Sequence, residues 1–351
     1  MRSALDGAPE NFRKQLATCL KMPVWGINFA PSWGQALRGL LQNRKDRRRV
    51  VMVPVFNRSF KKVTFAASGY QIKLNDFSPK PGFFEWQKVI DAAGPSVSTL
   101  VITHYFGVPV DFRLAIKYAK AKGTAIIEDC AHTLGGKIAG RWAGTCSDAA
   151  IYSFNYDKPI SLGWGGFALV NNPNLFDLTK PVKFRVPTKE EEIKLLKNFT
   201  AAMRWRRCMI RAENTLVLRS LRRLNLLNFS VFKKKADISI GAIQAELGRW
   251  SLEHYLGALK NRNATAKRIS TSIFQDCWPV GDSVNPAWLK QKIRISCKKA
   301  LRQASMKMQK QGVRLGNFNW PVLLENNQQK TIFLLLQMLR PIGLMCLFIR
   351  I

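Results

Sequence analysis

The sequence predicts an α/β fold with a mostly parallel sheet, because short apolar runs alternate with helical patterns over its first half. The runs are rich in Val and Ile, as expected for strands that are buried on both faces. Strands that alternate with helices are typical of a parallel sheet between two helical layers. The chain has 351 residues, enough for such a three-layer domain and a second, smaller one.

Five apolar runs are the predicted strands of this sheet. They are residues 50–56, 98–106, 123–130, 149–154 and 166–170. Two helices are expected nearby, over residues 33–43 and 111–123. The second is amphipathic, with Asp111 as a candidate N-cap and Gly123 as a stop signal. Together these elements predict the large domain.

The pattern changes in the second half of the chain. Residues 203–235 mix Leu, Val and Phe with many arginines and lysines, which predicts a basic amphipathic helix. A long helical pattern follows over residues 239–269. Residues 291–315 read as strand, helix and strand, which is typical of a small α+β domain.

We therefore predict two domains. The large domain covers residues 1–236 and includes a basic insertion over about 174–236, and a small α+β domain covers 237–351. The mostly apolar stretch 331–351 leaves three interpretations open: a core strand and helix, a transmembrane helix, or an aberrant end. A central Arg-Pro pair argues against a lone membrane span.

The net charge indicates the class of partner, and the cysteine content bears on metal sites and on the cellular compartment. A formal net charge of +34 implies an anionic partner, either nucleic acid, an acidic membrane or phosphorylated small molecules. The seven cysteines form no CxxC pair and the chain has three histidines, so no metal site is expected. Scattered thiols of odd number and the lack of an apolar stretch near the N-terminus favour a cytoplasmic protein, with membrane association left open.

One acid and one lysine in the predicted sheet suggest a specific chemistry. Asp129 ends the predicted strand 123–130, at the strand end where α/β sheets bind ligands, and Lys158 follows downstream. Pyridoxal phosphate requires a lysine for its Schiff base, a carboxylate beside its ring nitrogen, and donors at a helix N-terminus for its phosphate. Ser153 and the helix that starts at residues 33–35 are candidate phosphate donors. An acid and a lysine alone also fit a surface ion pair.

Longer motifs favour the cofactor. In order and spacing, the chain resembles the DegT/DnrJ/EryC1/StrS family of sugar aminotransferases, which have the aspartate-aminotransferase fold (fold type I of pyridoxal-phosphate enzymes). The matching pieces are THYFGVPVD (103–111), IIEDCAHTLGG (126–136), GRWAGTCSDAAIYSF (140–154), and Lys158 with GWGGFALVNN (163–172). A looser resemblance covers about residues 12–324.

The resemblance assigns roles to individual residues. Lys158 would form the Schiff base and shuttle the substrate proton, and Asp129 would pair with the pyridine nitrogen. His132 would hydrogen-bond near the 3-hydroxyl of the ring. Ser153 and Asn155 would contact the phosphate.

Further residues complete the implied site. Gly34 and Gln35 would offer backbone N–H groups to the phosphate. Phe56 is the nearest aromatic residue for stacking on the ring. His104 matches a family position, and we interpret it as a structural, buried imidazole.

Several positions depart from the family pattern. Trp33 replaces a glycine of the phosphate turn, and Arg58 stands where an aromatic usually stacks. Trp164 precedes the paired glycines, and the N-Y-R piece before Ile240 is absent. The lysine and the acid are retained, which argues against the related dehydratases, where a His replaces the lysine. A degenerate or specialised homologue stays open.

The resemblance implies a transaminase that moves an amino group, from glutamate, to a keto sugar on a nucleotide diphosphate. Such sugars enter lipopolysaccharide, other cell-surface polysaccharides or antibiotics, and the implied assembly is a homodimer. The alternative is a non-catalytic binding protein that contacts an anionic membrane through residues 203–235. A solvated basic insertion is the simpler interpretation of this segment, and no helix-turn-helix, RRM or zinc pattern supports nucleic-acid binding.

Overall fold

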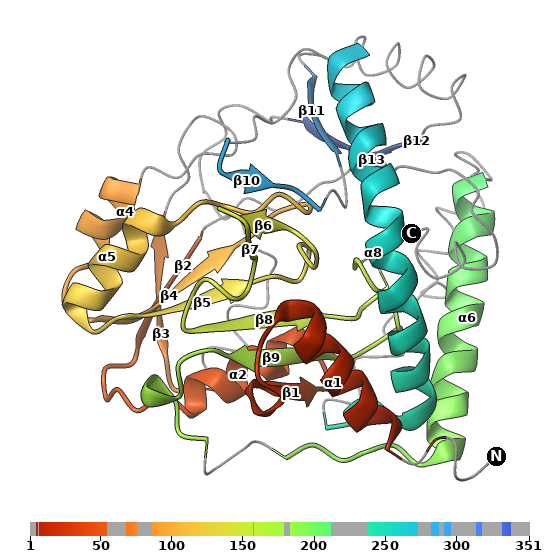
Figure 1. The fold of residues 1–351 in the computed structure, drawn as a ribbon, viewed down its shortest axis with the longest axis horizontal. Helices are drawn as coiled ribbons and strands as arrows, with labels where there is room; N and C mark the ends of the chain where they lie inside the picture. Colours follow the sequence, from red (N-terminus) through yellow and green to blue (C-terminus); the bar gives the residue numbers. More distant parts are fainter. Residues whose placement is uncertain are drawn as a thin grey trace, which may run out of the picture.

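The computed structural model describes most of the chain from the N-terminus to residue 272 and short stretches beyond it. The described residues are Leu5, 7–54, 68–75, 86–156, 158–178, 183–211, 237–272, 282–287, 291–295, 314–317 and 332–337. A seven-stranded sheet forms the centre of the large domain (Figure 1). The strand order is β1-β9-β8-β5-β4-β2-β3.

The strands of this sheet confirm the five predicted runs. They are β1 (Ile27–Ala30), β2 (Val50–Pro54), β3 (Gln71–Asn75), β4 (Val97–Thr103), β5 (Ala125–Asp129), β8 (Ala149–Ser153) and β9 (Gly166–Val170). The pairs β2–β3, β2–β4, β4–β5 and β5–β8 are parallel, whereas β9 is antiparallel to both β8 and β1. Strands β4, β5, β8 and β9 are buried along their whole length, which explains their continuous apolar sequences.

Helices cover both faces of the sheet, as the three-layer prediction requires. The helices on these faces are α1 (Ala8–Leu20), α2 (Trp33–Gln42), α4 (Trp86–Ala93), α5 (Arg113–Lys122) and α8 (Ala242–Ser272), and α6 (Lys189–Arg211) packs against α8. Helix α2 packs its leucines against one face, beside Val101 and Ile127. Helices α1, α4, α5 and α8 pack on the opposite face, whose residues alternate with those of the first along each strand. Turns of 3₁₀ helix occur at Val24–Gly26 and Pro173–Leu175.

Helix α5 corrects the predicted N-cap by one residue. The N-cap is Phe112, whose ring is buried in the core, and the carboxylate of Asp111 accepts a hydrogen bond from Arg113 N–H at 3.2 Å. At the other end, Gly123 has a φ of 60° and its N–H bonds the last turn of the helix, as predicted.

Two smaller sheets complete the described part of the fold. Strands β6 (Lys137–Ile138), β7 (Arg141–Trp142) and β10 (Val284–Asn285) form one, in the order β10-β6-β7. Strands β11 (Gln291–Ile295), β12 (Arg314–Asn317) and β13 (Ile332–Gln337) form an antiparallel sheet in the order β11-β13-β12. The two strands predicted within 291–315 are thus confirmed, and the intervening helix lies outside the described residues.

Other predictions for the second half are tested in part. The helical pattern 239–269 is confirmed by α8. Helix α6 includes residues 203–211 of the basic segment 203–235. The rest of that segment, residues 212–235, lies outside the described residues. Strand β13 lies within the stretch 331–351. Among the helices in the described ranges, none combines the length and apolar character needed to cross a membrane. The domain boundary at 236/237 stays a prediction.

A buried acid joins α6 to α8, which lie side by side (Figure 1). Glu192, in the first turn of α6, accepts a hydrogen bond from Gln244 N–H at 2.7 Å and further bonds from the N–H groups of Ala242 and Ile243. These N–H groups begin α8 and have no acceptor within that helix. A Cβ at Gly241 would lie 2.3 Å from the carboxyl carbon of Glu192, so the glycine is needed for this approach.

The Glu192→Ala variant should lower the free energy of unfolding by about 1–3 kcal/mol, because it leaves buried N–H groups unpaired. Glu190→Ala, an exposed change in the same helical turn, should alter it by no more than about 0.5 kcal/mol. Urea denaturation followed by circular dichroism measures both values. Equal stability of the two variants would contradict the capping role.

Asp111 attaches the segment around β10 to the large domain. The Ser283 hydroxyl donates to Asp111 Oδ2 at 2.6 Å, and Ala287 N–H donates to Gly107 O at 2.7 Å. The hydrogen-bonded Arg113 guanidinium is the main cause that lowers the pKa of Asp111 from 3.8 to about 2, and the Ser283 hydroxyl contributes.

Because its folded pKa is depressed, ionised Asp111 contributes stability above its ordinary pKa, and this contribution is lost as the pH falls from about 4 towards 2. Asp111→Asn should therefore make the acid loss of stability shallower in that window. Urea midpoints of both proteins, compared from pH 6 down to about pH 2, measure the difference. Parallel curves would show that Asp111 does not stabilise the fold through its charge.

Candidate active site

Lys158 and His132 meet beyond the carboxyl ends of β5 and β8. Lys158 lies in the loop after β8, and His132 lies in the turn after β5. The Lys158 Nζ is 2.8 Å from His132 Nε2. On its other side, the His132 ring accepts a hydrogen bond at Nδ1 from Phe106 N–H at 3.3 Å. The imidazole is buried and the lysine is half-buried.

Asp129 is the last residue of β5 and is also buried. Burial raises its pKa, whereas the Ala131 N–H, which donates to Oδ1 at 3.1 Å, and the positive charge of Lys158 act in the opposite direction. A buried carboxylate in this position favours a positive charge beside it, such as a protonated ring nitrogen. Asp129 and Lys158 are 29 residues apart in the sequence (158 − 129), and the structure brings them close enough to interact electrostatically.

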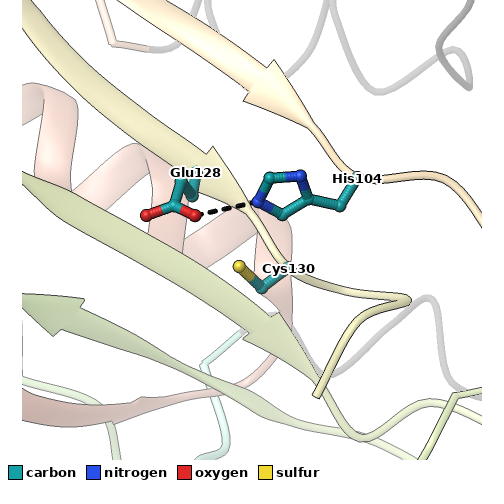
Figure 2. Close-up of side chains that lie close together, drawn as sticks. All are labelled: His104, Glu128 and Cys130. Atoms are coloured by element: carbon teal, nitrogen blue, oxygen red, sulfur yellow. Dashed lines mark hydrogen bonds and ion pairs between the residues drawn. The ribbon is translucent and has the colours of Figure 1, made fainter. Parts of the chain in front are cut away.

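A second buried acid, Glu128, precedes Asp129 in β5 and is bonded to His104 (Figure 2). Its carboxylate accepts hydrogen bonds from four donors: His104 Nε2 at 2.8 Å, Gly144 N–H at 2.8 Å, Cys146 N–H at 3.2 Å and the Ser147 hydroxyl at 2.7 Å. The Nδ1 of His104 accepts from Val110 N–H at 3.0 Å. Both ring nitrogens of His104 are thus bonded, which confirms its interpretation as a buried structural imidazole.

Figure 2 also shows Cys130 beside this pair, and the ligand atoms of His104, Glu128 and Cys130 lie within 4.8 Å of one another. Metal binding at this cluster would be costly. The Val110 bond leaves the ring proton of His104 on Nε2, which donates to Glu128. Burial raises the pKa of the Cys130 thiol well above its usual value, which disfavours the thiolate that a metal requires. The cluster is a hydrogen-bonded support for the strand that carries Asp129.

Paired glycines bring Ser153 to the N-terminus of α2. Gly165 N–H donates to Pro31 O at 2.9 Å. A Cβ on Gly166 would lie 2.2 Å from Tyr152 O and 3.1 Å from Trp33 N, so only glycine fits between β8 and the start of α2. The buried Ser153 ends β8 at this point. A hydroxyl beside a helix N-terminus is a suitable place for a phosphate group.

The predicted phosphate donors differ in their local bonding. Gly34 lies in the first turn of α2, whereas the N–H of Gln35 donates to the Ser32 hydroxyl at 3.2 Å. Asn155 N–H donates to Ser153 Oγ at 3.3 Å, and Asn155 O accepts from Lys158 N–H at 3.1 Å. Asn155 therefore shapes the loop that leads to Lys158. Contacts of these residues with a phosphate stay predictions.

Two departures from the family pattern are accommodated by packing. Trp33 is half-buried against the apolar cluster beneath α2. Trp164 is buried, its indole N–H donates to Ser239 O at 3.3 Å, and its carbonyl accepts from Gln244 Nε2 at 2.9 Å. Trp164 thus fixes the loop after Lys158 to the start of α8. Phe56 and Arg58 lie outside the described residues.

Sequence reasoning missed Phe106, which acts through its backbone N–H. Phe106 has a φ of 59° and precedes Gly107, with a φ of 92°, in a left-handed turn that is uncommon for a phenylalanine. It lies within the matching motif at residues 103–111, but its residue type does not indicate a hydrogen-bonding role.

Comparison with known proteins identifies the class of this site. The model of the DegT/DnrJ/EryC1/StrS aminotransferase family matches residues 34–322, and the chain belongs to this family. The aminotransferases of the family use pyridoxal 5′-phosphate, and the fold is fold type I of the enzymes that bind this cofactor.

Solved structures support the fold at low sequence identity. DesV from S. venezuelae superimposes with a TM-score of 0.66 and 18% identity, covering 95% of this chain and 89% of that one. A DegT DnrJ EryC1 StrS aminotransferase from Brucella abortus gives a TM-score of 0.64 and 16% identity, with 96% and 90% covered. Among curated proteins, GDP-perosamine synthase from Escherichia coli O157:H7 is 35% identical over 78 residues, which span 22% of this chain and 21% of that protein.

The Glu128→Gln variant should lower the free energy of unfolding by about 2–3 kcal/mol, since its amide would place N–H groups against donors that now share a carboxylate. Glu246→Gln is the matched control. It removes one half-exposed ion pair with Arg249 and should change this free energy by less than about 1 kcal/mol. Urea denaturation compares the two, and a Glu128→Gln protein as stable as the control would argue against the supporting role of Glu128.

Proposed function

We propose that this protein is an active pyridoxal-phosphate-dependent transaminase whose acceptor is a keto sugar. The observation that supports this function most directly is the amine of Lys158 at 2.8 Å from His132, beside the buried carboxylate of Asp129. The residues present fit the cofactor of the family. They offer a lysine amine, a buried carboxylate, and a hydroxyl beside a helix N-terminus.

Each residue has a distinct task in this proposal. Lys158 would hold the cofactor covalently and then move a proton to and from the substrate carbon. The carboxylate of Asp129 would hold a positive charge on the ring nitrogen. His132 would donate a hydrogen bond beside the ring hydroxyl. When bound, pyridoxal phosphate supplies the electron sink that stabilises negative charge on that carbon.

The phosphate of the cofactor would lie at the N-terminus of α2. Ser153 would contact it through its hydroxyl, with Gly34 and Gln35 contributing N–H groups and Asn155 contributing a side-chain contact. The N–H of Gln35 now bonds the Ser32 hydroxyl, and a phosphate would have to share or replace that bond. Phe56 remains the proposed stacking residue.

The proposed acceptor is a keto sugar linked to a nucleotide diphosphate, and the proposed donor is glutamate. Two observations support this choice. The E. coli relative is named a GDP-perosamine synthase, and the net charge of +34 would attract a diphosphate electrostatically. We also propose a cytoplasmic homodimer that serves cell-surface polysaccharide synthesis, such as that of lipopolysaccharide.

The alternative is a degenerate homologue that binds an anionic membrane through residues 203–235. Most of this segment lies outside the described residues, and no observed contact favours this function over a solvated insertion. A binding protein of this kind needs no cofactor at Lys158. Covalent attachment of the cofactor therefore separates the two proposals.

Incubation with pyridoxal phosphate and reduction with borohydride should fix the cofactor to Lys158, as read by peptide mass spectrometry. Lys158→Ala should abolish the attachment and the visible absorbance of the bound cofactor. Lys117→Ala, a change on the exposed face of α5, should preserve both. Added glutamate should bleach the visible band of the wild type. Attachment at other lysines alone, or none, would refute the enzymatic function.

A further inference from the structure

The loop that carries Lys158 leaves the end of β8 and returns to it. On the outgoing side, Lys158 N–H donates to Asn155 O at 3.1 Å. On the returning side, Leu162 N–H donates to Phe154 O at 2.8 Å, and Gly163 pairs with Asn155 in an isolated bridge. Because the two sides are bonded to each other, the position of the returning side affects where the lysine lies.

A buried side chain of α8 holds the returning side of this loop. Gln244 is fully buried, and its Nε2 donates to Leu162 O at 3.1 Å and to Trp164 O at 2.9 Å. A carboxamide nitrogen has two hydrogens, and the two carbonyls use both. The opposite orientation of the carboxamide would set its oxygen against two carbonyl oxygens, so the contacts themselves assign the nitrogen.

The two carbonyls reach one amide because the chain bends between them. Gly163 has a φ of 93°, in the left-handed region that favours glycine. A Cβ at this position would lie 2.8 Å from Cγ of Phe199 in α6, so a larger residue would displace the bend. The backbone of Gln244 is also fixed, because its N–H donates to the buried Glu192 at 2.7 Å. The amide that holds the loop thus has little freedom of its own.

We propose that Gln244 is a positioning residue for Lys158. Its two hydrogen bonds fix the returning side of the loop, and the loop in turn holds the lysine amine within reach of the cofactor. The inference rests on the proposed function, in which the lysine nitrogen bonds to the aldehyde carbon of pyridoxal phosphate and water is released. The loss of Gln244 should slow this reaction, because its rate depends steeply on the relative position of the two reacting groups.

This role separates covalent attachment from simple binding. Pyridoxamine phosphate has an amine in place of the aldehyde, so it binds without forming a bond to Lys158. The proposed contacts with the phosphate and the ring nitrogen, from Ser153, the start of α2 and Asp129, lie outside the segment that Gln244 holds. Removal of the Gln244 amide should therefore slow attachment and preserve the affinity for pyridoxamine phosphate, whereas a general loosening of the fold would lower both.

The variants Gln244→Met and Gln244→Glu test the role. Methionine is similar in size and has no N–H group, a carboxylate has no donor, and a protonated carboxyl has one donor for two carbonyls. Timed reduction with borohydride, which adds hydride to the C=N bond, followed by peptide mass spectrometry, measures the rate of attachment. Both variants should attach pyridoxal phosphate to Lys158 about tenfold more slowly than the wild type. Their calorimetric Kd for pyridoxamine phosphate should stay within about twofold of the wild-type value.

The variant Val89→Ala is the matched control for lost stability. Val89 is buried in the cluster beneath α4 and α5, which includes none of the described residues of the Lys158 loop. The truncation leaves a small cavity in the core and keeps the hydrogen bonds of Gln244. This protein should attach the cofactor at the wild-type rate although it unfolds at a lower temperature.

Hydrogen exchange of the cofactor-free protein tests the hold on the loop without any ligand. The N–H of Leu162, which donates to Phe154 O, reports the closure of the loop. In peptides that cover residues 159–166, its exchange should be about tenfold faster in both Gln244 variants and unchanged in Val89→Ala. Unchanged exchange in folded Gln244 variants would show that Gln244 does not hold the loop.

The results distinguish the two proposals. If borohydride fixes no cofactor on Lys158 of the wild type, the proposed function fails, and hydrogen exchange still decides whether Gln244 holds the loop. If the wild type attaches the cofactor and the folded Gln244→Met protein does so at the same rate, the function stands and the positioning role is refuted. An equal loss of attachment and of pyridoxamine phosphate affinity would also refute it, as the sign of a general structural role. Gln244→Glu keeps the size and shape of the side chain, so it decides the question if Gln244→Met does not fold.

Discussion

The parallel pairing of β4, β5 and β8 is the constraint on which the rest of the structure depends. It places Thr103 opposite Asp129, and Asp129 opposite Ile151, so the three strands end at one edge of the sheet. The segments that follow the strands carry His104 and Phe106, His132, and Lys158 respectively. Because these segments start from neighbouring strand ends, residues distant in the sequence reach hydrogen-bonding distance.

This edge is polar although it is buried, and its stability depends on complete hydrogen bonding. Glu128 has four donors, both nitrogens of His104 and of His132 have partners, and Asp129 accepts from the backbone. A buried charge without partners would be strongly destabilising. Most of the donors are backbone N–H groups from tight turns, so the turns after β4 and β5 position the chemistry as much as the side chains do.

The antiparallel strand β9 extends the site towards α2. Its first residue, Gly166, lets the chain pass between Ser153 and the first residues of that helix, where a Cβ would overlap backbone atoms. Trp164, immediately before the paired glycines, ties the same loop to α8 through its indole and its carbonyl. Trp164, which departs from the family pattern, therefore links the loop that carries Lys158 to the start of α8.

The sequence by itself determined five of the seven strands of the large sheet and its mostly parallel arrangement, because buried strands have continuous apolar sequences. The recognisable order of its motifs also singled out Asp129 and Lys158. It also indicated the structural role of His104. Only the tertiary structure decided that Glu128 is the shared acceptor of four donors, that Trp164 contacts α8, and that the N–H of Phe106 donates to His132. The physical reason is that these roles depend on backbone N–H and C=O groups, which every residue type carries, and on contacts between distant turns.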